Sequence, residues 1–260
     1  MKFLTILVVV LIYKNWLGGH PLREIVSVDG WFGWVKDVVR SETIRFVVAV
    51  VVPSLLLLWI SVEMTGWLLG LVYLALSIVV VLYAVDIIDL DVLFDDHRLW
   101  LRTEDTSEAA KEQQQDSFRT DIIYESFQSI VPSLFWFLCL GPAGALLYVL
   151  SEQYLNDLSD EDEAFPFADQ LLYWMEWIPA RISGLLFAVL GDFRRGLSAF
   201  VDTMADTQSG IALTLREVAD GAAGQKSADT DEELEDLRWM VEANLWGWVG
   251  LTALLTIAGW

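Results

Sequence analysis

The stretch FVVAVVVPSLLLLWISV, residues 46–62, contains no charged side chain and decides the class of fold. A helix needs about 20 mostly apolar residues to cross a bilayer, and this stretch approaches that length. Barrel strands alternate apolar and polar residues, so a run this continuous predicts a helix. Similar runs recur along the chain. We therefore expect an all-α fold, a polytopic membrane helical bundle with about six hydrophobic segments, near 3–18, 46–62, 67–86, 130–152, 170–191 and 244–260.

The first of these segments, MKFLTILVVVLIYKNWLGG, also has features of a secretion signal, with one lysine followed by an apolar core. It lacks a small-x-small cleavage site and continues into an aromatic, basic end at Tyr13, Lys14 and Trp16. We expect it to be retained as a helix. No second domain with a core of its own is indicated, so residues 1–260 are expected to form one membrane domain.

The positive charges indicate how the bundle is oriented. Segments 20–45 (with the flanking Lys14), 87–128 and 193–240 carry 14 of the 16 Lys and Arg residues, and connections 61–66 and 154–169 carry none. By the positive-inside rule, the three basic segments are predicted to be cytoplasmic. Six spans would then place both termini on the external side.

The formal net charge of −21 comes largely from acidic clusters at 104–116, 157–163 and 229–236. We interpret these clusters as solvated loop surface, and we expect 103–117 and 221–232 to be flexible tethers. A surface this negative repels phosphate, so a nucleic-acid partner is disfavoured. The single Cys139 and only two histidines argue against a disulfide framework and a zinc site.

Arg181 is the most notable polar residue within a predicted span. It lies in EWIPARISGLLFAVLGDF, residues 176–193, two positions after Pro179. Charges within membranes are costly and often functional, but an arginine near a boundary can also reach the headgroups or pair with Glu176. Both interpretations stay open. Ala180, Gly184 and Ala188 line one face of the same helix and predict a helix-packing surface.

Other candidate site residues lie on the cytoplasmic approach to segment 130–152. In RTDIIYESFQSI, residues 119–130, Arg119 is followed by Asp121 and Glu125, whose like charges share a helix face at i, i+4 and repel unless a cation or ligand lies between them. A separate aspartate group, including Asp86, Asp89 and Asp91, ends the third span. Carboxylates are ligands that Mg²⁺ prefers, but such a group also suits a plain helix boundary.

Two blocks carry a family resemblance: ESFQSIVPSLFWFLCLGPAGALLY (125–148) and EWIPARISG (176–184). Together they resemble the AmpE family of bacterial inner-membrane proteins and, more distantly, the CobD/CbiB family. Pro132, Gly141, Pro142 and Gly144 interrupt the first block and are expected to break its helix. An aromatic patch with Asp29, Trp31 and Phe32 also suits AmpE.

The resemblance implies two alternative functions. An AmpE-like protein would be a regulatory signalling modulator in the inner membrane, linked to β-lactamase induction and without settled catalysis. Besides the lipid bilayer, its partner would be a cell-wall-derived small molecule or a cytoplasmic protein. A CobD/CbiB-like protein would form an amide with Mg–ATP in cobalamin synthesis, but Tyr124-Glu125-Ser126 departs from that family's pattern. The ligand-binding candidates are Glu125, Arg181, Asp121, Arg119 and Glu176, with Asp86, Asp89 and Asp91 as metal candidates.

Overall fold

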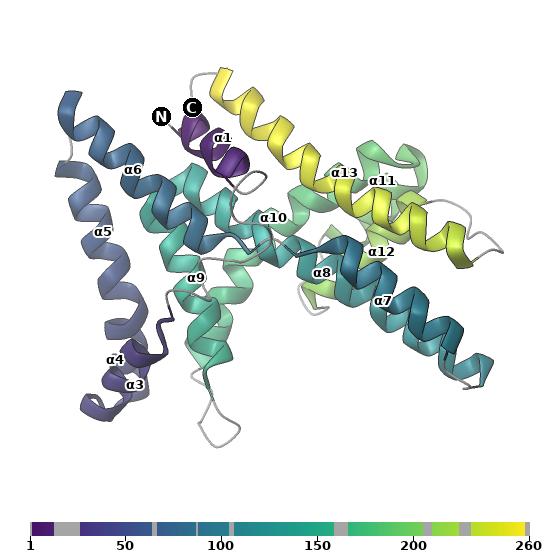
Figure 1. Cartoon of the computed structure of the whole chain (residues 1–260), viewed down its shortest axis with the longest axis horizontal. Helices are drawn as coiled ribbons and strands as arrows, with labels where there is room; N and C mark the ends of the chain where they lie inside the picture. The colour runs from purple at the N-terminus through teal and green to yellow at the C-terminus, as the bar shows by residue number, and fades with distance from the viewer. Residues whose placement is uncertain are drawn as a thin grey trace. The chain divides into compact units, whose positions relative to one another are not determined.

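The computed structural model describes residues 2–12, 27–63, 67–86, 88–103, 107–158, 166–204, 210–223 and 230–257. Within these ranges all regular secondary structure is helical, which confirms the predicted all-α class (Figure 1). The helices are α1 (Lys2–Ile12), α3 (Asp29–Val38), α4 (Glu42–Phe46), the π-helical turn η2 (Val47–Val51), α5 (Val52–Glu63), α6 (Trp67–Ala84), α7 (Leu90–Thr103), α8 (Glu108–Leu140), α9 (Pro142–Asn156), α10 (Pro166–Leu190), α11 (Phe193–Met204), α12 (Ile211–Ala223) and α13 (Thr230–Ile257).

The helices pack into two compact units, each interleaved in the sequence. Unit 1 comprises Met1–Ile87, Ile130–Glu176 and Leu255–Trp260, and unit 2 comprises Ile88–Ser129 and Trp177–Leu254. Helices α8, α10 and α13 each have residues in both units. The expected single membrane domain over 1–260 therefore stays a prediction.

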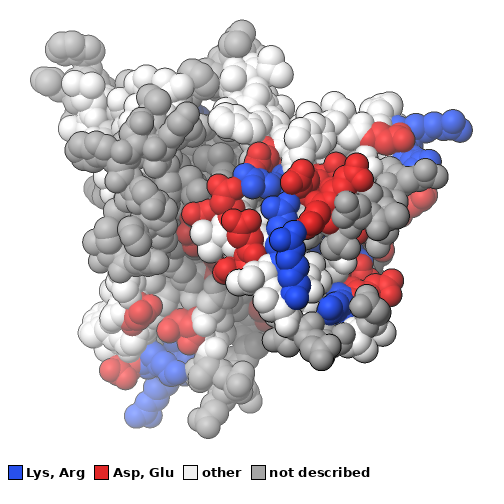
Figure 2. Space-filling model, turned by 45° about the vertical axis from the view of Figure 1, so that its right-hand side comes forward, with Lys and Arg blue, Asp and Glu red and all other residues white. Residues whose placement is uncertain are grey.

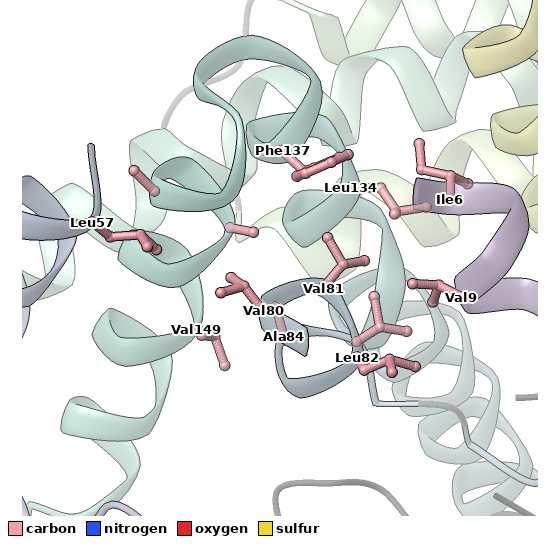
Figure 3. Packing of buried hydrophobic residues seen from close by; sticks show 13 residues of the cluster. Ile6, Val9, Leu57, Val80, Val81, Leu82, Ala84, Leu134, Phe137 and Val149 are labelled. Atoms are coloured by element: carbon pink, nitrogen blue, oxygen red, sulfur yellow. The ribbon is translucent and has the colours of Figure 1, made fainter. Parts of the chain in front are cut away.

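Unit 1 contains two apolar clusters. In the first, α9 packs against α5 and α6, while α1 packs against α6 (Figure 3). Phe137 and Val81 are fully buried there, and the Ser133 hydroxyl donates to the carbonyl of Ala84 at 2.9 Å, where α6 ends. The second cluster joins α3, η2 and α9 around buried aromatic and aliphatic side chains, including Phe32, Val35, Phe46, Val50 and Tyr154.

The apolar run 130–152 is divided between two helices, because α8 ends at Leu140 and α9 begins at Pro142. The break lies at Gly141, which has φ of 71° and is the one described residue in the left-handed region. Only glycine adopts this conformation without steric cost, and proline suits the first turn of the next helix. The expected interruption at Pro132 is wrong, since α8 continues through that residue.

In unit 2, α11 and α12 pack closely through small residues. The predicted packing face on α10 is present. Gly184 and Ala188 on this face lie against two residues of α11, the Phe200 ring and Gly196 respectively. Its partner within the unit is thus α11, which lies in the segment 193–240 that we predict to be cytoplasmic. Helix α10 itself runs uninterrupted through Pro179, so no new helix starts at that proline.

Two described helical stretches are long and apolar enough to cross a membrane, 42–63 and 109–140. The first matches the predicted segment 46–62, and the shorter apolar helix Gly70–Ala84 lies within the predicted segment 67–86. The count of six spans and the external termini stay predictions. The prediction of a flexible tether at 103–117 is wrong in part, because helix α8 already begins at Glu108. Residues 104–106 lie outside the described ranges.

Candidate functional site: an arginine–carboxylate network in unit 2

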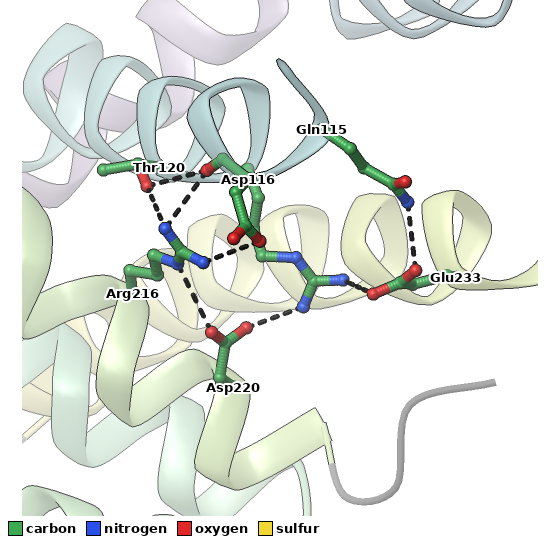
Figure 4. Close-up of polar contacts among 7 residues, drawn as sticks. Gln115, Asp116, Thr120, Arg216, Asp220 and Glu233 are labelled. Carbon is green, nitrogen blue, oxygen red and sulfur yellow. Dashed lines mark hydrogen bonds and ion pairs between the residues drawn. The ribbon is translucent and has the colours of Figure 1, made fainter. Parts of the chain in front are cut away.

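The most developed polar cluster in the described chain joins three helices of unit 2 around Arg119, and Figure 4 shows the side chains that surround it. The guanidinium of Arg119, on α8, pairs with Asp220 of α12 at 2.6 Å and with Glu233 of α13. Its side chain is only 7% exposed. A guanidinium removed from water is stable only when its charge and its N–H groups are satisfied, and the two carboxylates do both.

A second guanidinium, that of Arg216 on α12, extends the network. It pairs with Asp116 of α8 at 2.8 Å and with Asp220 at 3.4 Å, and it donates to the Thr120 hydroxyl at 3.0 Å. Asp220 is therefore shared by both arginines. The Gln115 amide donates to Glu233 at 3.0 Å and closes the other side. Three carboxylates thus surround two guanidinium groups.

Helical periodicity explains why these side chains converge. Asp116, Arg119 and Thr120 are spaced i, i+3 and i+4, so they share one face of α8. Arg216 and Asp220 are four apart on α12. Glu233 lies in the acidic first turn of α13, where the helix dipole favours negative charge. Each helix therefore presents its part of the network on a single face.

The acidic start of α13 also holds the arginines of α7. Arg102 pairs with Asp231 at 2.8 Å, Arg98 with Glu235 at 3.4 Å, and Arg238 of α13 reaches back to Asp91 at 2.5 Å. Acidic and basic side chains lie interspersed on the face drawn in Figure 2. The cluster 229–236, which we interpreted as solvated loop, is thus in its described part an ion-paired helix start.

An open hollow lies beside the network on α8 and α12. Its lining includes Asp116 and Arg216 of the network together with the predicted site residue Asp121. Asp121 and Glu125 are both exposed and lie on successive turns of α8. Arg119, by contrast, is buried in ion pairs. The structure therefore separates two roles among the predicted residues: Arg119 fixes α8, whereas Asp121 and Glu125 face solvent.

Glu176 and Arg181 are buried, each within its own unit. In unit 1, the Tyr148 hydroxyl donates to the Glu176 carboxylate at 3.0 Å. In unit 2, the guanidinium of Arg181 lies over the Trp177 ring, 4.8 Å from its centroid, in a cation–π contact. The suggested Glu176–Arg181 pair stays a prediction.

The aspartates at the start of α7 have structural contacts. Asp89 caps the helix, since its carboxylate accepts from the backbone N–H of Val92 at 3.3 Å, and Asp91 pairs with Arg238. Asp86 belongs to unit 1. Within the described ranges, no group of three or more His, Cys, Asp or Glu side chains is arranged to hold a metal ion. These contacts favour the helix-boundary interpretation.

His97, on α7, is a buried titratable group that the sequence did not single out. Its ring stacks on Phe118 with 3.8 Å between centroids and an interplanar angle of 5°. It is 6% exposed, and its Nε2 makes no hydrogen bond with any described residue. Burial lowers the pKa of His97, so the imidazole is neutral near pH 7.

Sequence reasoning found Arg119 and Asp121 but missed Arg216, Asp116, Asp220 and Glu233. The available signal was the i, i+4 spacing of Arg216 and Asp220, which indicates only a local helix pair. The other ion-pair partners in the network lie about a hundred residues apart along the sequence, as Arg119 and Asp220 do. No periodicity within one helix predicts which face of another it will meet.

Taken together, these features define an all-helical protein in which two helices have the length and composition of membrane spans and a charged helical unit is joined by ion pairs. A family model described as "Regulatory signalling modulator protein AmpE" matches residues 97–259. This is more than half of the chain, which therefore belongs to the AmpE family. No curated protein matches the chain, and no solved structure does.

The family match confirms the AmpE resemblance and includes both sequence blocks, 125–148 and 176–184. It does not include the aromatic patch of Asp29, Trp31 and Phe32. The more distant similarity to the CobD/CbiB family is not shown by this match, and the amide-forming alternative is not favoured.

Proposed function

We propose that this chain is a multi-pass protein of the bacterial inner membrane, which senses a cell-wall-recycling ligand linked to β-lactamase induction. The observation that carries the proposal is that the matched range of the regulatory family contains the whole Arg119 network. The apolar helical stretch 42–63 supports membrane insertion. The distribution of Lys and Arg supports a cytoplasmic position for the network.

Two helices give the network a route for signalling. Helix α8 is continuous from the network residues to the apolar segment that ends at Leu140, and α13 is continuous from Glu233 to the apolar segment that ends at Ile257. A shift of either helix would change the distances between Arg119 and its two carboxylates. Ion-pair networks with two alternative arrangements can act as the bistable element that a signal biases.

Asp121 and Glu125 are the residues that we propose contact the ligand. Both carboxylates are exposed, and their repulsion at i, i+4 would be relieved by a cationic group between them. The amino group of a cell-wall peptide has the required charge. Arg119 would act indirectly, by holding α8 against α12 and α13.

A reporter experiment tests the regulatory role. A strain without the endogenous copy would carry a β-lactamase promoter fused to a reporter, complemented with wild type, Arg119→Met or Arg102→Met. Arg102 has an exposed pair on the same unit and is the matched control. We expect Arg119→Met, but not Arg102→Met, to alter the induced level. An uncomplemented strain that responds to a β-lactam like the complemented one would refute the proposal.

A thermal-shift panel tests the ligand. A ligand that binds only the folded state raises the melting temperature, by the equivalent of about 2.7 kcal/mol at a hundred times its Kd. Anhydro-muropeptide should stabilise the wild type, and the double variant Asp121→Asn/Glu125→Gln should lose this shift without a fall in its basal melting temperature, because it also loses the repulsion between the two carboxylates. Stabilisation by Mg–ATP with adenosylcobyric acid, and none by muropeptide, would contradict the sensing role.

A further inference from the structure

Helix α3, outside the range matched by the family, is joined to the candidate span 42–63 by one specific hydrogen bond. Pro53 has no N–H to donate to the carbonyl of Ala49, four residues earlier. The indole N–H of Trp31 donates to that carbonyl instead, at 3.1 Å. Ala49 lies in the π-helical turn η2, in the first half of the helical stretch 42–63. In hydrocarbon a freed carbonyl must be satisfied by protein, so this contact suits a span.

The hydrogen bond leaves one apolar face of α3 exposed. Phe32 and Val35 are buried against η2 and α9, whereas Trp31, Trp34 and Val38 are 38%, 54% and 61% exposed. The exposed three are spaced i, i+3 and i+7 and so form one stripe. The Trp31 and Trp34 rings stack with 5.4 Å between their centroids. Two stacked indoles form a large apolar surface with polar edges.

Like this stripe, the helical stretch 42–63 also exposes apolar side chains. Only 28% of the most apolar part of 42–63 is buried. The exposed residues of this stretch include Leu55, Leu56, Trp59 and Val62. Arg40 and Arg45 lie at the same end as α3. Tryptophan beside arginine or lysine at the end of an apolar helix is the composition found at membrane–water interfaces.

We propose that α3 is an interfacial helix that lies in the headgroup layer of the bilayer, with Trp31, Trp34 and Val38 facing the lipid. A helix with one aromatic apolar stripe and charged flanks binds in this way. The flanking Lys36, Arg40 and Arg45 supply cations that suit anionic lipid headgroups. The occupant of this surface is thus the bilayer, and a protein partner is an outcome that the test distinguishes.

The proposal rests on membrane insertion of 42–63, so the experiment tests insertion separately. In full-length protein carrying Cys139→Ser and reconstituted into nanodiscs with anionic lipid, a fluorophore would be attached at one new cysteine. The sites are Trp34→Cys on the stripe, Gly33→Cys off the stripe and about 100° round α3 from Trp34, and Trp59→Cys within the apolar stretch. A side chain at Gly33 meets open space, so this control perturbs no packing.

Quenching by a nitroxide-labelled lipid and by aqueous iodide reports the position of each site. We expect severalfold stronger lipid quenching at 34 than at 33, iodide quenching mainly at 33, and strong lipid quenching at 59. If 59 is quenched by lipid but 34 behaves like 33, the interfacial helix is refuted while insertion stands. Shielding of 34 from both quenchers would assign the stripe to a protein contact and also overturn the proposal. Absence of lipid quenching at 59 would overturn insertion itself and, with it, this proposal.

Discussion

Gly144 of α9 lies directly against the backbone carbonyl of Trp136 in α8, so that a Cβ at position 144 would overlap that oxygen. The contact follows the reversal at Gly141 and Pro142. The sequence GPAG therefore contains two glycines for two reasons: Gly141 supplies the positive φ, and Gly144 allows two helix backbones to meet.

The contact predicts that Gly144→Ala destabilises the protein. The added methyl group forces the two backbones apart, and overpacking of this kind typically costs about 1–3 kcal/mol. Thermal unfolding of detergent-purified protein measures the effect. Gly250→Ala on α13 is the control, because a Cβ there meets nothing within 4 Å and alanine is the better helix former. Equal melting temperatures for Gly144→Ala and wild type would contradict the predicted clash.

Removal of the Arg119 guanidinium should be the most destabilising charge change in unit 2. Arg119→Met leaves Asp220 and Glu233 close together without their shared cation, and breaking a buried pair in this way costs about 3–5 kcal/mol. Arg102→Met removes an exposed pair, which is worth about 1 kcal/mol or less. Unfolding curves for both variants provide the comparison. Similar losses for the two would mean that burial does not strengthen the Arg119 pairs.

The burial of His97 leads us to expect that the protein loses stability in mild acid. Because burial lowers its pKa in the folded state, the unfolded chain takes up a proton at about pH 6.5, before the folded chain does. The contribution of neutral His97 to the free energy of unfolding is thus fully present above pH 6.5. It is lost as the pH falls towards the pKa of His97 in the folded state. We expect His97→Phe, which retains an aromatic ring against Phe118, to reduce the fall in melting temperature between pH 7 and pH 5. If the melting temperatures of variant and wild type fall in parallel between pH 7 and pH 5, His97 is not a source of the loss of stability in acid.

A buried indole joins α13 to α10 within unit 2. Trp248 is 1% exposed and donates to the Ser183 hydroxyl at 2.8 Å, while the Asn244 amide donates to the Ser183 carbonyl at 2.9 Å. Trp248→Phe removes one bond and leaves a small void, so we expect a cost of about 1–3 kcal/mol. Trp246→Phe, at a position that is 66% exposed, should change stability by less than about 0.5 kcal/mol. Melting temperatures of the two variants would be compared, and a larger loss for Trp246→Phe would refute this.

The sequence predicted the elements that depend on local pattern. The helical class, the segment 46–62 and the break at Gly141 and Pro142 all follow from composition and from the chemistry of glycine and proline. The family followed from two motif blocks. By contrast, the expected break at Pro132 is absent, and that residue lies inside a continuous helix, as Pro179 also does, because an internal proline is tolerated where surrounding packing holds the helix.

The candidate site was predicted only in part, because its partners come from distant helices. Arg119 and Asp121 were found from their place before the apolar segment. The acidic residues near 116 and 233 suggested solvated loops, since a single sequence does not indicate that Arg216 and Arg119 meet them. Those ion pairs hold the end of the expected tether, at Asp116, within helix α8.

The separation of these partners along the chain has a consequence for how the protein is made. Arg98 and Arg119 are synthesised 137 and 114 residues before their partners Glu235 and Glu233 on α13. Until α13 has been synthesised, these arginines therefore carry charges that its carboxylates have not yet neutralised. Under the proposed multi-pass insertion, both arginines would count toward orientation before α13 exists, and their pairs with Glu235 and Glu233 would form only after α13 has been synthesised.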